Sequence, residues 1–152
     1  MLAKPLFLYP PVYLALFLLA QWGLDTHYPV LNFAPTVWLF WLGAGLIAAS
    51  VLVVLLINFQ FKKAETSIIP YKESDALLTS GFFAYSRNPI YLMMATVLLG
   101  AALMFSSLAP FLPVFVFPIL IQWRFIKAEE AMVEEAFGEE YREYKASVRR
   151  WI

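Results

Sequence analysis

The chain has 152 residues, of which 62% are hydrophobic and 14% are charged, whereas soluble domains are roughly 45–50% apolar and about 25% charged. This composition excludes an ordinary soluble domain. Lysine plus arginine equals aspartate plus glutamate at 11 each, so no net charge attracts nucleic acid. Because the chain has no cysteine and a single histidine, His27, we expect no disulfide, no metal site, no catalytic triad and no nucleic-acid partner.

The charged residues are segregated along the chain, and 13 of the 22 lie in residues 124–152. Three windows hold none: residues 5–24, 26–61 and 88–123. A bilayer core about 30 Å thick needs about 20 helical residues, so the first two windows each fit one membrane-spanning helix and the third fits two short ones. We therefore predict an all-α integral membrane protein, a single domain of residues 1–152, with four spans at about residues 6–22, 36–59, 89–105 and 109–126.

The loops predict the orientation, because basic residues in short loops favour the cytoplasmic side. Four basic residues lie between the second and third predicted spans: Lys62, Lys63, Lys72 and Arg87. Lys4 and the basic C-terminal tail belong on the same side, so we expect a multi-pass protein with both termini in the cytoplasm. The first span could instead be a signal peptide, because Lys4 precedes an apolar run, but no small-x-small cleavage site follows in residues 18–22.

Small residues and prolines in two predicted spans indicate how helices pack. In the second span, Gly43-Ala44-Gly45 lacks the strand, the third glycine and the acidic residue of a dinucleotide-binding loop. We interpret it as a small-residue face that lets another helix approach closely. In the fourth span, Pro113 and Pro118 remove backbone hydrogen bonds and predict a bend, which either opens a cavity or is merely a kink.

The connection at residues 60–88 is longer than joining two helices requires. Gly81 can adopt a positive φ, Asn88 is placed to cap the third span, and Pro89 suits the first turn of that span. Arg87 therefore stands at a helix N-terminus, where a cation opposes the helix dipole unless an anion lies between them. That anion is either a ligand group such as a carboxylate or a lipid phosphate in the headgroup zone.

The C-terminal segment, residues 124–151, is predicted to form helices at the cytoplasmic membrane surface. At about 100° per residue, Glu129 falls inside an apolar stripe and Glu130 falls at its border. The stripe consists of Phe125, Ile126, Met132, Val133 and Ala136. A carboxylate there is costly unless it is hydrogen-bonded, so Glu129 needs a donor, either a ligand or a structural partner such as Arg87.

Gly138 offers a stop to this helix. Beyond it, four apolar or aromatic residues repeat at spacings of 3, 4 and 3, which predicts a helix lying in the membrane interface. They are Tyr141, Tyr144, Val148 and Trp151.

Several motifs occur together from about residue 60 to the end of the chain. They are Thr66, Pro70, Leu78-x-x-Gly81, Ser86-Arg-Asn-Pro-x-Tyr91, Glu129-Glu130, Phe137-Gly138-x-x-Tyr141-x-x-Tyr144 and Val148-Arg-Arg-Trp151. In combination they resemble the isoprenylcysteine carboxyl methyltransferase and phospholipid methyltransferase superfamily. The resemblance implies a multi-span enzyme that uses S-adenosylmethionine, with its cofactor pocket at the cytoplasmic face. It also implies Arg87 and Tyr91 as candidate catalytic residues, and as the cofactor-binding set Gly81, Tyr85, Ser86, Arg87, Asn88, Pro89, Tyr91, Glu129 and Glu130.

The chemistry that the resemblance implies suits this residue inventory, because methyl transfer from a sulfonium needs positioning and desolvation more than an acid or a base. We expect a lipophilic acceptor that enters from the lipid bilayer: a phospholipid amine, a prenylated carboxylate or thiol, or a small lipophilic metabolite. Two other functions stay open. One is an NADPH-dependent membrane enzyme similar to sterol reductases, and the other is a non-enzymatic membrane scaffold.

Overall fold

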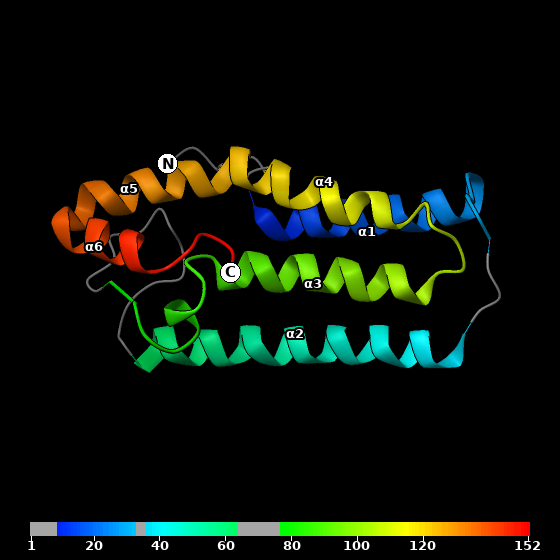
Figure 1. Cartoon of the computed structure of the whole chain (residues 1–152), viewed down its shortest axis with the longest axis horizontal. Coiled ribbons are helices and arrows are strands. Elements are labelled where there is room, and N and C mark those ends of the chain that lie inside the picture. The colour runs from blue at the N-terminus through cyan, green and yellow to red at the C-terminus, as the bar shows by residue number, and fades with distance from the viewer. Residues whose placement is uncertain (1–8, 33–35, 64–76) are drawn as a thin grey trace, which may run out of the picture. The chain divides into compact units, whose positions relative to one another are not determined.

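The computed structural model describes residues 9–32, 36–63 and 77–152, and every regular element within these ranges is helical. In chain order the elements are α1 (Pro10–His27), α2 (Val37–Lys63), η2 (Gly81–Ala84), α3 (Pro89–Met104), α4 (Phe111–Ile121), η3 (Gln122–Ile126), α5 (Lys127–Phe137) and α6 (Glu139–Ser147) (Figure 1). The short η2 is a 3-10 helix and η3 is a π-helix. The predicted all-α class is confirmed for the described residues.

Within the described ranges, two helices are long and apolar enough to cross a membrane. They are α2, with 27 residues, and the continuous helical run Phe111–Phe137, which joins α4, η3 and α5 and also has 27 residues. The apolar α3 has 16 residues, a length of about 24 Å against a bilayer core of about 30 Å. The four predicted helices are thus present as α1 to α4, while the crossing of the membrane by all four stays a prediction.

The helix ends differ from the predicted ones for a local reason. The predicted first span ends at residue 22, but α1 continues to His27 and includes the charged Asp25. The Oγ of Ser107 donates to Oδ1 of Asp25 over 2.7 Å, so this carboxylate is compatible with the helix. Thr66, Pro70, Lys72 and the predicted start of the first span at residue 6 lie outside the described residues.

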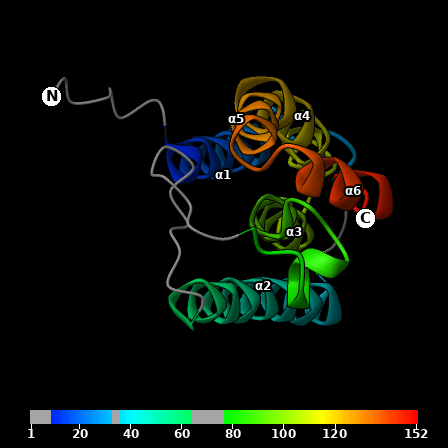
Figure 2. The ribbon, with the colours of Figure 1, turned by 90° about the vertical axis from the view of Figure 1, so that its left-hand side faces the viewer.

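The chain divides into two compact units, residues 1–50 with 94–121 as unit one and residues 51–93 with 122–152 as unit two. In unit one, α1 and α4 lie side by side (Figures 1 and 2). The rings of Phe17 and Phe117 meet edge to face across this contact, with 5.3 Å between their centroids. Phe117 is fully buried, as are Leu98 and Ala102 of α3, so the core of unit one includes α3 as well as this helix pair.

Glycines allow α2 and α3 to approach closely within unit one. A Cβ atom on Gly100 would lie 2.7 Å from the backbone oxygen of Gly43, and a Cβ on Gly43 would overlap the oxygen of Gly100. A Cβ on Gly45 would meet nothing within 4 Å. The predicted small-residue packing face is therefore confirmed at Gly43, and Gly45 takes no part in it.

A buried amide links α1 to two other segments of unit one. Gln21 is fully buried, and its Nε2 donates to the backbone oxygens of Leu98 and Pro110, each over 2.9 Å. Its Oε1 is buried without a hydrogen-bond partner among the described residues. Directed bonds of this kind fix helices to one another where apolar contacts alone carry no direction.

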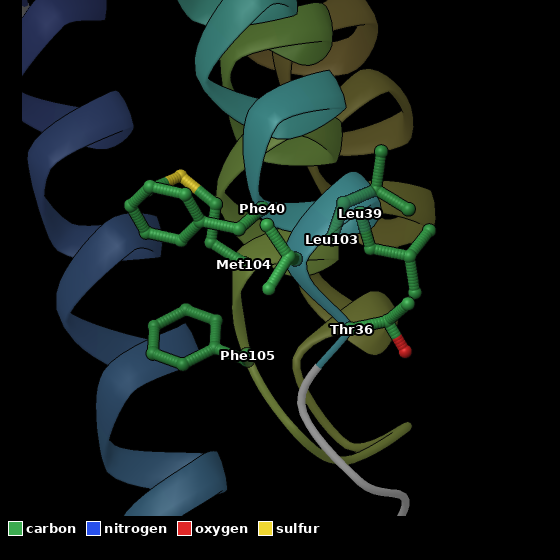
Figure 3. A pocket seen from close by; sticks show the side chains of 7 residues that line it. Thr36, Leu39, Phe40, Leu103, Met104 and Phe105 are labelled. Carbon is green, nitrogen blue, oxygen red and sulfur yellow. The ribbon is translucent and has the colours of Figure 1, made fainter.

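Unit one also contains a pocket of about 230 Å³ between the start of α2 and the end of α3 (Figure 3). Its lining is almost entirely apolar: Thr36, Val37, Leu39, Phe40, Leu103, Met104 and Phe105. None of the candidate site residues lines it.

Unit two holds the loop before α3, the helix α5 and the C-terminal segment. The segment after α6 ends beside the start of α3 (Figures 1 and 2). The predicted helix through residue 151 is wrong at its end, because α6 stops at Ser147 and Val148 is extended, with φ −120° and ψ 132°. The loop before α3 donates hydrogen bonds to the carbonyls of Arg149 and Arg150, and these tertiary bonds hold the segment after Ser147 in a non-helical conformation.

Candidate active site

The loop before α3 owes its shape to residues at its two ends. Gly81 has a φ of +63°, and a Cβ there would overlap the side chain of Gln60, so both the backbone and the available space favour glycine. Pro89 is the first residue of α3, where its missing N–H costs nothing. Between them, the Oγ of the buried Ser86 accepts from the backbone N–H of Asn88 over 3.1 Å. The predicted positive φ of Gly81 and the predicted place of Pro89 in the first turn of the helix are confirmed.

Three hydrogen bonds hold the C-terminal segment on this loop. The backbone N–H of Arg87 donates to the carbonyl of Arg149 over 3.0 Å. The carbonyl of Arg150 accepts from Nδ2 of Asn88 over 3.1 Å and from Oγ of Ser86 over 3.4 Å. The side chain of Arg150 is thereby placed next to the loop that carries Arg87.

Tyr91 and Glu129 form a short hydrogen bond. The hydroxyl of the buried Tyr91 donates to Oε1 of the half-buried Glu129 over 2.7 Å, a length typical of a well-formed O–H···O hydrogen bond. This is the donor that the position of Glu129 on an apolar stripe required. The alternative partner considered from the sequence, Arg87, pairs with the neighbouring carboxylate instead.

Glu130 lies between two guanidinium groups. Arg150 binds both of its oxygens, with Nε to Oε1 at 2.9 Å and Nη2 to Oε2 at 2.7 Å. Nη1 of Arg87 lies 3.3 Å from Oε1. Glu130 is buried, and the side chain of Arg87 is 8% exposed. A buried carboxylate with two cations is chemically unlike Glu129, which accepts a hydrogen bond from a neutral hydroxyl.

The guanidinium of Arg87 has spare hydrogen-bonding capacity. Its Nε is buried and has no hydrogen-bond partner among the described residues. Its Nη1 donates to the hydroxyl of Tyr141 over a long 3.5 Å. Buried donors are normally satisfied, and an unsatisfied one in a native fold suggests a group that binds there. Here the fitting group is an acceptor, best an anionic one.

Two buried tyrosines of α6 contact the loop before α3: Tyr141 contacts Arg87, and Tyr144 contacts Phe83. Burial raises the pKa of Tyr141, and the negative charge of Glu130 adds to this effect. Burial likewise raises the pKa of Tyr144, whose hydroxyl donates to the carbonyl of Phe83 over 2.7 Å. Both side chains therefore stay neutral at ordinary pH and serve as hydrogen-bonding hydroxyls.

The structure gathers most, but not all, of the residues predicted from the sequence. Arg87, Tyr91, Glu129 and Glu130 come together, while Gly81, Ser86, Asn88 and Pro89 shape the loop. Tyr85 is 79% exposed, and within the described ranges no side-chain hydrogen bond or ion pair joins it to these residues. Within the described ranges, no group of three or more His, Cys, Asp or Glu residues is placed to hold a metal ion.

Arg150 was not predicted as a site residue. The sequence did contain a signal for it, because a glutamate at the border of an apolar helix face needs a cation when it is buried. The path of the non-helical backbone after Ser147 decides which basic residue of the tail reaches Glu130, and that backbone was predicted as helix.

Comparisons with known proteins find a matching family and a similar protein. The model of the phospholipid methyltransferase family matches residues 38–140, a range that contains the loop before α3 and all of α5. An uncharacterized protein of Haemophilus influenzae is 38% identical over 63 residues, which are 41% of this chain and 100% of that protein. No solved structure matches the chain significantly.

Proposed function

The chain belongs to the phospholipid methyltransferase family, which implies methyltransferase activity, and from this premise we propose that it transfers a methyl group from S-adenosylmethionine to a lipophilic acceptor. The observation that carries the proposal is the cluster in unit two. A buried cation with an unpartnered donor, Arg87, lies in the same cluster as a carboxylate that is held by a tyrosine hydroxyl, Glu129 with Tyr91.

The side chains of the cluster fit the polar groups of S-adenosylmethionine. Its methionine end carries a carboxylate, and Nε of Arg87 is a buried donor without an acceptor. Its ribose carries hydroxyl groups, and Glu129 uses Oε1 for Tyr91, so that Oε2 can accept from a hydroxyl. We therefore assign Arg87 to the carboxylate and Glu129 to the ribose of the cofactor.

The other predicted residues act on the shape of the site. We assign Gly81, Ser86, Asn88 and Pro89 to holding the loop that carries Arg87, and Glu130 to holding the guanidinium groups around it. Tyr85 stays an expectation from the family resemblance. These roles are proposals about binding and orientation, which are the contributions that a protein makes to a positioned displacement.

When bound, S-adenosylmethionine would supply an electrophilic methyl group on a sulfonium: an acceptor nucleophile would bond to the methyl carbon in line with the C–S bond, which breaks, and S-adenosylhomocysteine would leave with the electron pair. The chain's own residues orient the two reactants and exclude water from them. Tyr91 takes part by fixing the carboxylate of Glu129, because its buried hydroxyl donates to that group. No residue needs to act as a nucleophile in this scheme.

The proposed acceptor is lipophilic, since α2 and the run Phe111–Phe137 are long and apolar enough to lie in a bilayer. Methyl transfer should then favour acceptors that carry a long apolar chain over water-soluble analogues with the same nucleophile. Equal turnover of the chain-free analogue at matched concentration would contradict this part of the proposal.

Binding experiments separate the proposed function from the other two classes. The full chain, purified in detergent, is titrated by calorimetry with S-adenosylmethionine and, separately, with NADPH. The proposal requires saturable binding of S-adenosylmethionine. Binding of NADPH alone would instead indicate a reductase, and binding of neither would indicate a scaffold.

We also propose four spans with both termini and the site in the cytoplasm, based on the distribution of basic residues in the loops. Reporter fusions after Thr26 and after Ile152 test it, because the two reporters should lie on opposite sides of the membrane. Reporters on the same side would overturn the four-span topology.

A further inference from the structure

The two arginines that contact Glu130 do so unequally. Arg150 forms two parallel hydrogen bonds, one to each carboxylate oxygen, at 2.9 and 2.7 Å. Arg87 reaches only Oε1, at an ion-pair distance of 3.3 Å. Bidentate pairing of guanidinium with carboxylate is the stronger and more directional arrangement. Most of the charge of Glu130 is therefore compensated by Arg150.

This asymmetry leaves Arg87 short of negative charge. Arg87, Arg150 and Glu130 together carry two positive charges and one negative charge, and the side chain of Arg87 is 8% exposed. Its Nε has no hydrogen-bond partner among the described residues. Without Arg150, Glu130 would be free to turn both oxygens towards Arg87, and a closed one-to-one ion pair would occupy the guanidinium.

We propose that Arg150 is a positioning residue that engages Glu130 and thereby keeps the guanidinium of Arg87 available for the anionic end of the bound ligand. The inference rests on the proposed function, in which Arg87 binds the cofactor carboxylate. It assigns Arg150 no contact with the ligand. Hydrogen bonding to Glu130 raises the pKa of the Arg150 guanidinium, so Arg150 is charged throughout the range in which the protein would be measured.

The side chain of Arg150 can be substituted without removing the hydrogen bonds that hold the C-terminal segment on the loop before α3. The bonds that hold the tail on the loop go to the carbonyls of Arg149 and Arg150, not to their side chains. Arg149 is exposed, and its side chain makes no hydrogen bond or salt bridge with the described residues. Arg149→Gln is therefore a matched control, with the same substitution one residue away.

The experiment measures the affinity of the purified full chain for two ligands. S-adenosylhomocysteine carries the carboxylate, and 5′-methylthioadenosine lacks the whole amino-acid end. We expect Arg150→Gln to weaken binding of S-adenosylhomocysteine roughly tenfold or more, the usual effect of losing one hydrogen bond to a charged group. Binding of 5′-methylthioadenosine should change little. Arg149→Gln should change neither.

A second variant separates positioning from direct contact. The double variant Glu130→Gln/Arg150→Gln removes both the carboxylate that would pair with Arg87 and the arginine that engages this carboxylate. Arg87 should then be available to the ligand again, so affinity for S-adenosylhomocysteine should recover in part. Arg150→Lys, which cannot bridge both oxygens as a planar fork does, should be intermediate. Thermal melting of each ligand-free variant identifies any variant that fails to fold, and the folded ones decide the result.

Each outcome has a defined meaning. A selective loss for the carboxylate ligand with recovery in the double variant supports the inference. Equal loss for both ligands, or no recovery in the double variant, overturns it, since Arg150 would then serve the fold or touch the ligand. An unchanged affinity of Arg150→Gln for S-adenosylhomocysteine overturns this inference but leaves the proposed function standing. A wild-type protein that binds neither ligand overturns the proposed function, and this inference with it.

Discussion

The hydroxyl of Tyr91, on the first turn of α3, donates a hydrogen bond to Oε1 of Glu129 on α5 over 2.7 Å. The two residues are 38 positions apart in the chain, and both lie in unit two. One carboxylate oxygen is thereby fixed by the protein. The other oxygen is the acceptor on which the proposed cofactor contact depends.

The first prediction concerns Glu129→Gln. The substitution keeps the size of the side chain, and its amide oxygen can still accept from Tyr91, so the ligand-free melting temperature should change little. The bond proposed between the carboxylate and the cofactor loses its charge, which costs about 1.5–3 kcal/mol, or roughly 10- to 150-fold in affinity. Calorimetric titration with S-adenosylmethionine and melting of the ligand-free protein measure the two effects.

Glu134→Gln is the control for this experiment. Glu134 lies on the same helix, but its partners are the surface side chains of Arg142 and Lys145. It should alter neither cofactor affinity nor, to any large extent, stability. A Glu129→Gln protein that melts early but binds the cofactor normally would assign Glu129 to the fold and not to the site.

The second prediction is a pH dependence that comes from Tyr144. Burial raises the pKa of this tyrosine above its ordinary value of 10.0, so the folded state holds the proton more tightly than the unfolded state does. The stability contributed by the neutral hydroxyl is complete below pH 10 and falls as the pH rises from there towards the folded-state pKa. Wild-type melting temperature should decline in that alkaline range.

The Tyr144→Phe variant isolates this effect. It loses the hydrogen bond to Phe83, so at neutral pH it should be less stable by about 0.5–1.5 kcal/mol. Above pH 10 its stability should fall less steeply than that of the wild type, so the two curves converge. Tyr85→Phe removes the hydroxyl of a side chain that is 79% exposed and should leave the wild-type profile unchanged. Parallel curves for wild type and Tyr144→Phe would refute the linkage.

The third prediction tests the close approach of α2 and α3. In Gly43→Ala the new methyl group would overlap the backbone oxygen of Gly100 and lie 2.8 Å from Cγ of Met104. A helix backbone cannot move aside as a flexible side chain can, so we expect a loss of about 1–3 kcal/mol, the usual cost of overpacking. Thermal unfolding in detergent measures it.

Gly45→Ala provides the matched comparison on the same helix. A Cβ there meets nothing within 4 Å, and alanine favours a helix over glycine by up to about 1 kcal/mol. This variant should be as stable as the wild type or slightly more so. Equal destabilisation by the two substitutions would mean that helix propensity or lipid contact, and not the Gly100 contact, governs this face.

The sequence predicted those features that depend on neighbouring residues. Pro89 begins α3, Gly81 takes a positive φ, and Gly138 follows the last residue of α5 with a φ of +55°. Gly43 packs against another helix as its size suggested. In each case the residue's own backbone or volume determines the outcome, so no knowledge of distant segments was needed.

Features that depend on distant partners were not predictable in the same way. Glu129 and Glu130 are adjacent on one helix, and about 100° of rotation decides which of them meets Arg87. The structure gives that contact to Glu130. The non-helical tail after Ser147 has the same origin, because the loop before α3, which is distant in the sequence, donates the hydrogen bonds that hold the carbonyls of Arg149 and Arg150.

Gln21 shows what one polar side chain contributes to an otherwise apolar bundle. Leucine and phenylalanine side chains tolerate sliding of one helix along another, so a bundle held by them alone has several alignments of similar energy. The amide of Gln21 reaches the carbonyls of Leu98 and Pro110 together, and a shift of one helical turn would leave that N–H group unsatisfied among hydrocarbon. Its main effect is thus to remove this degeneracy and select a single register for α1.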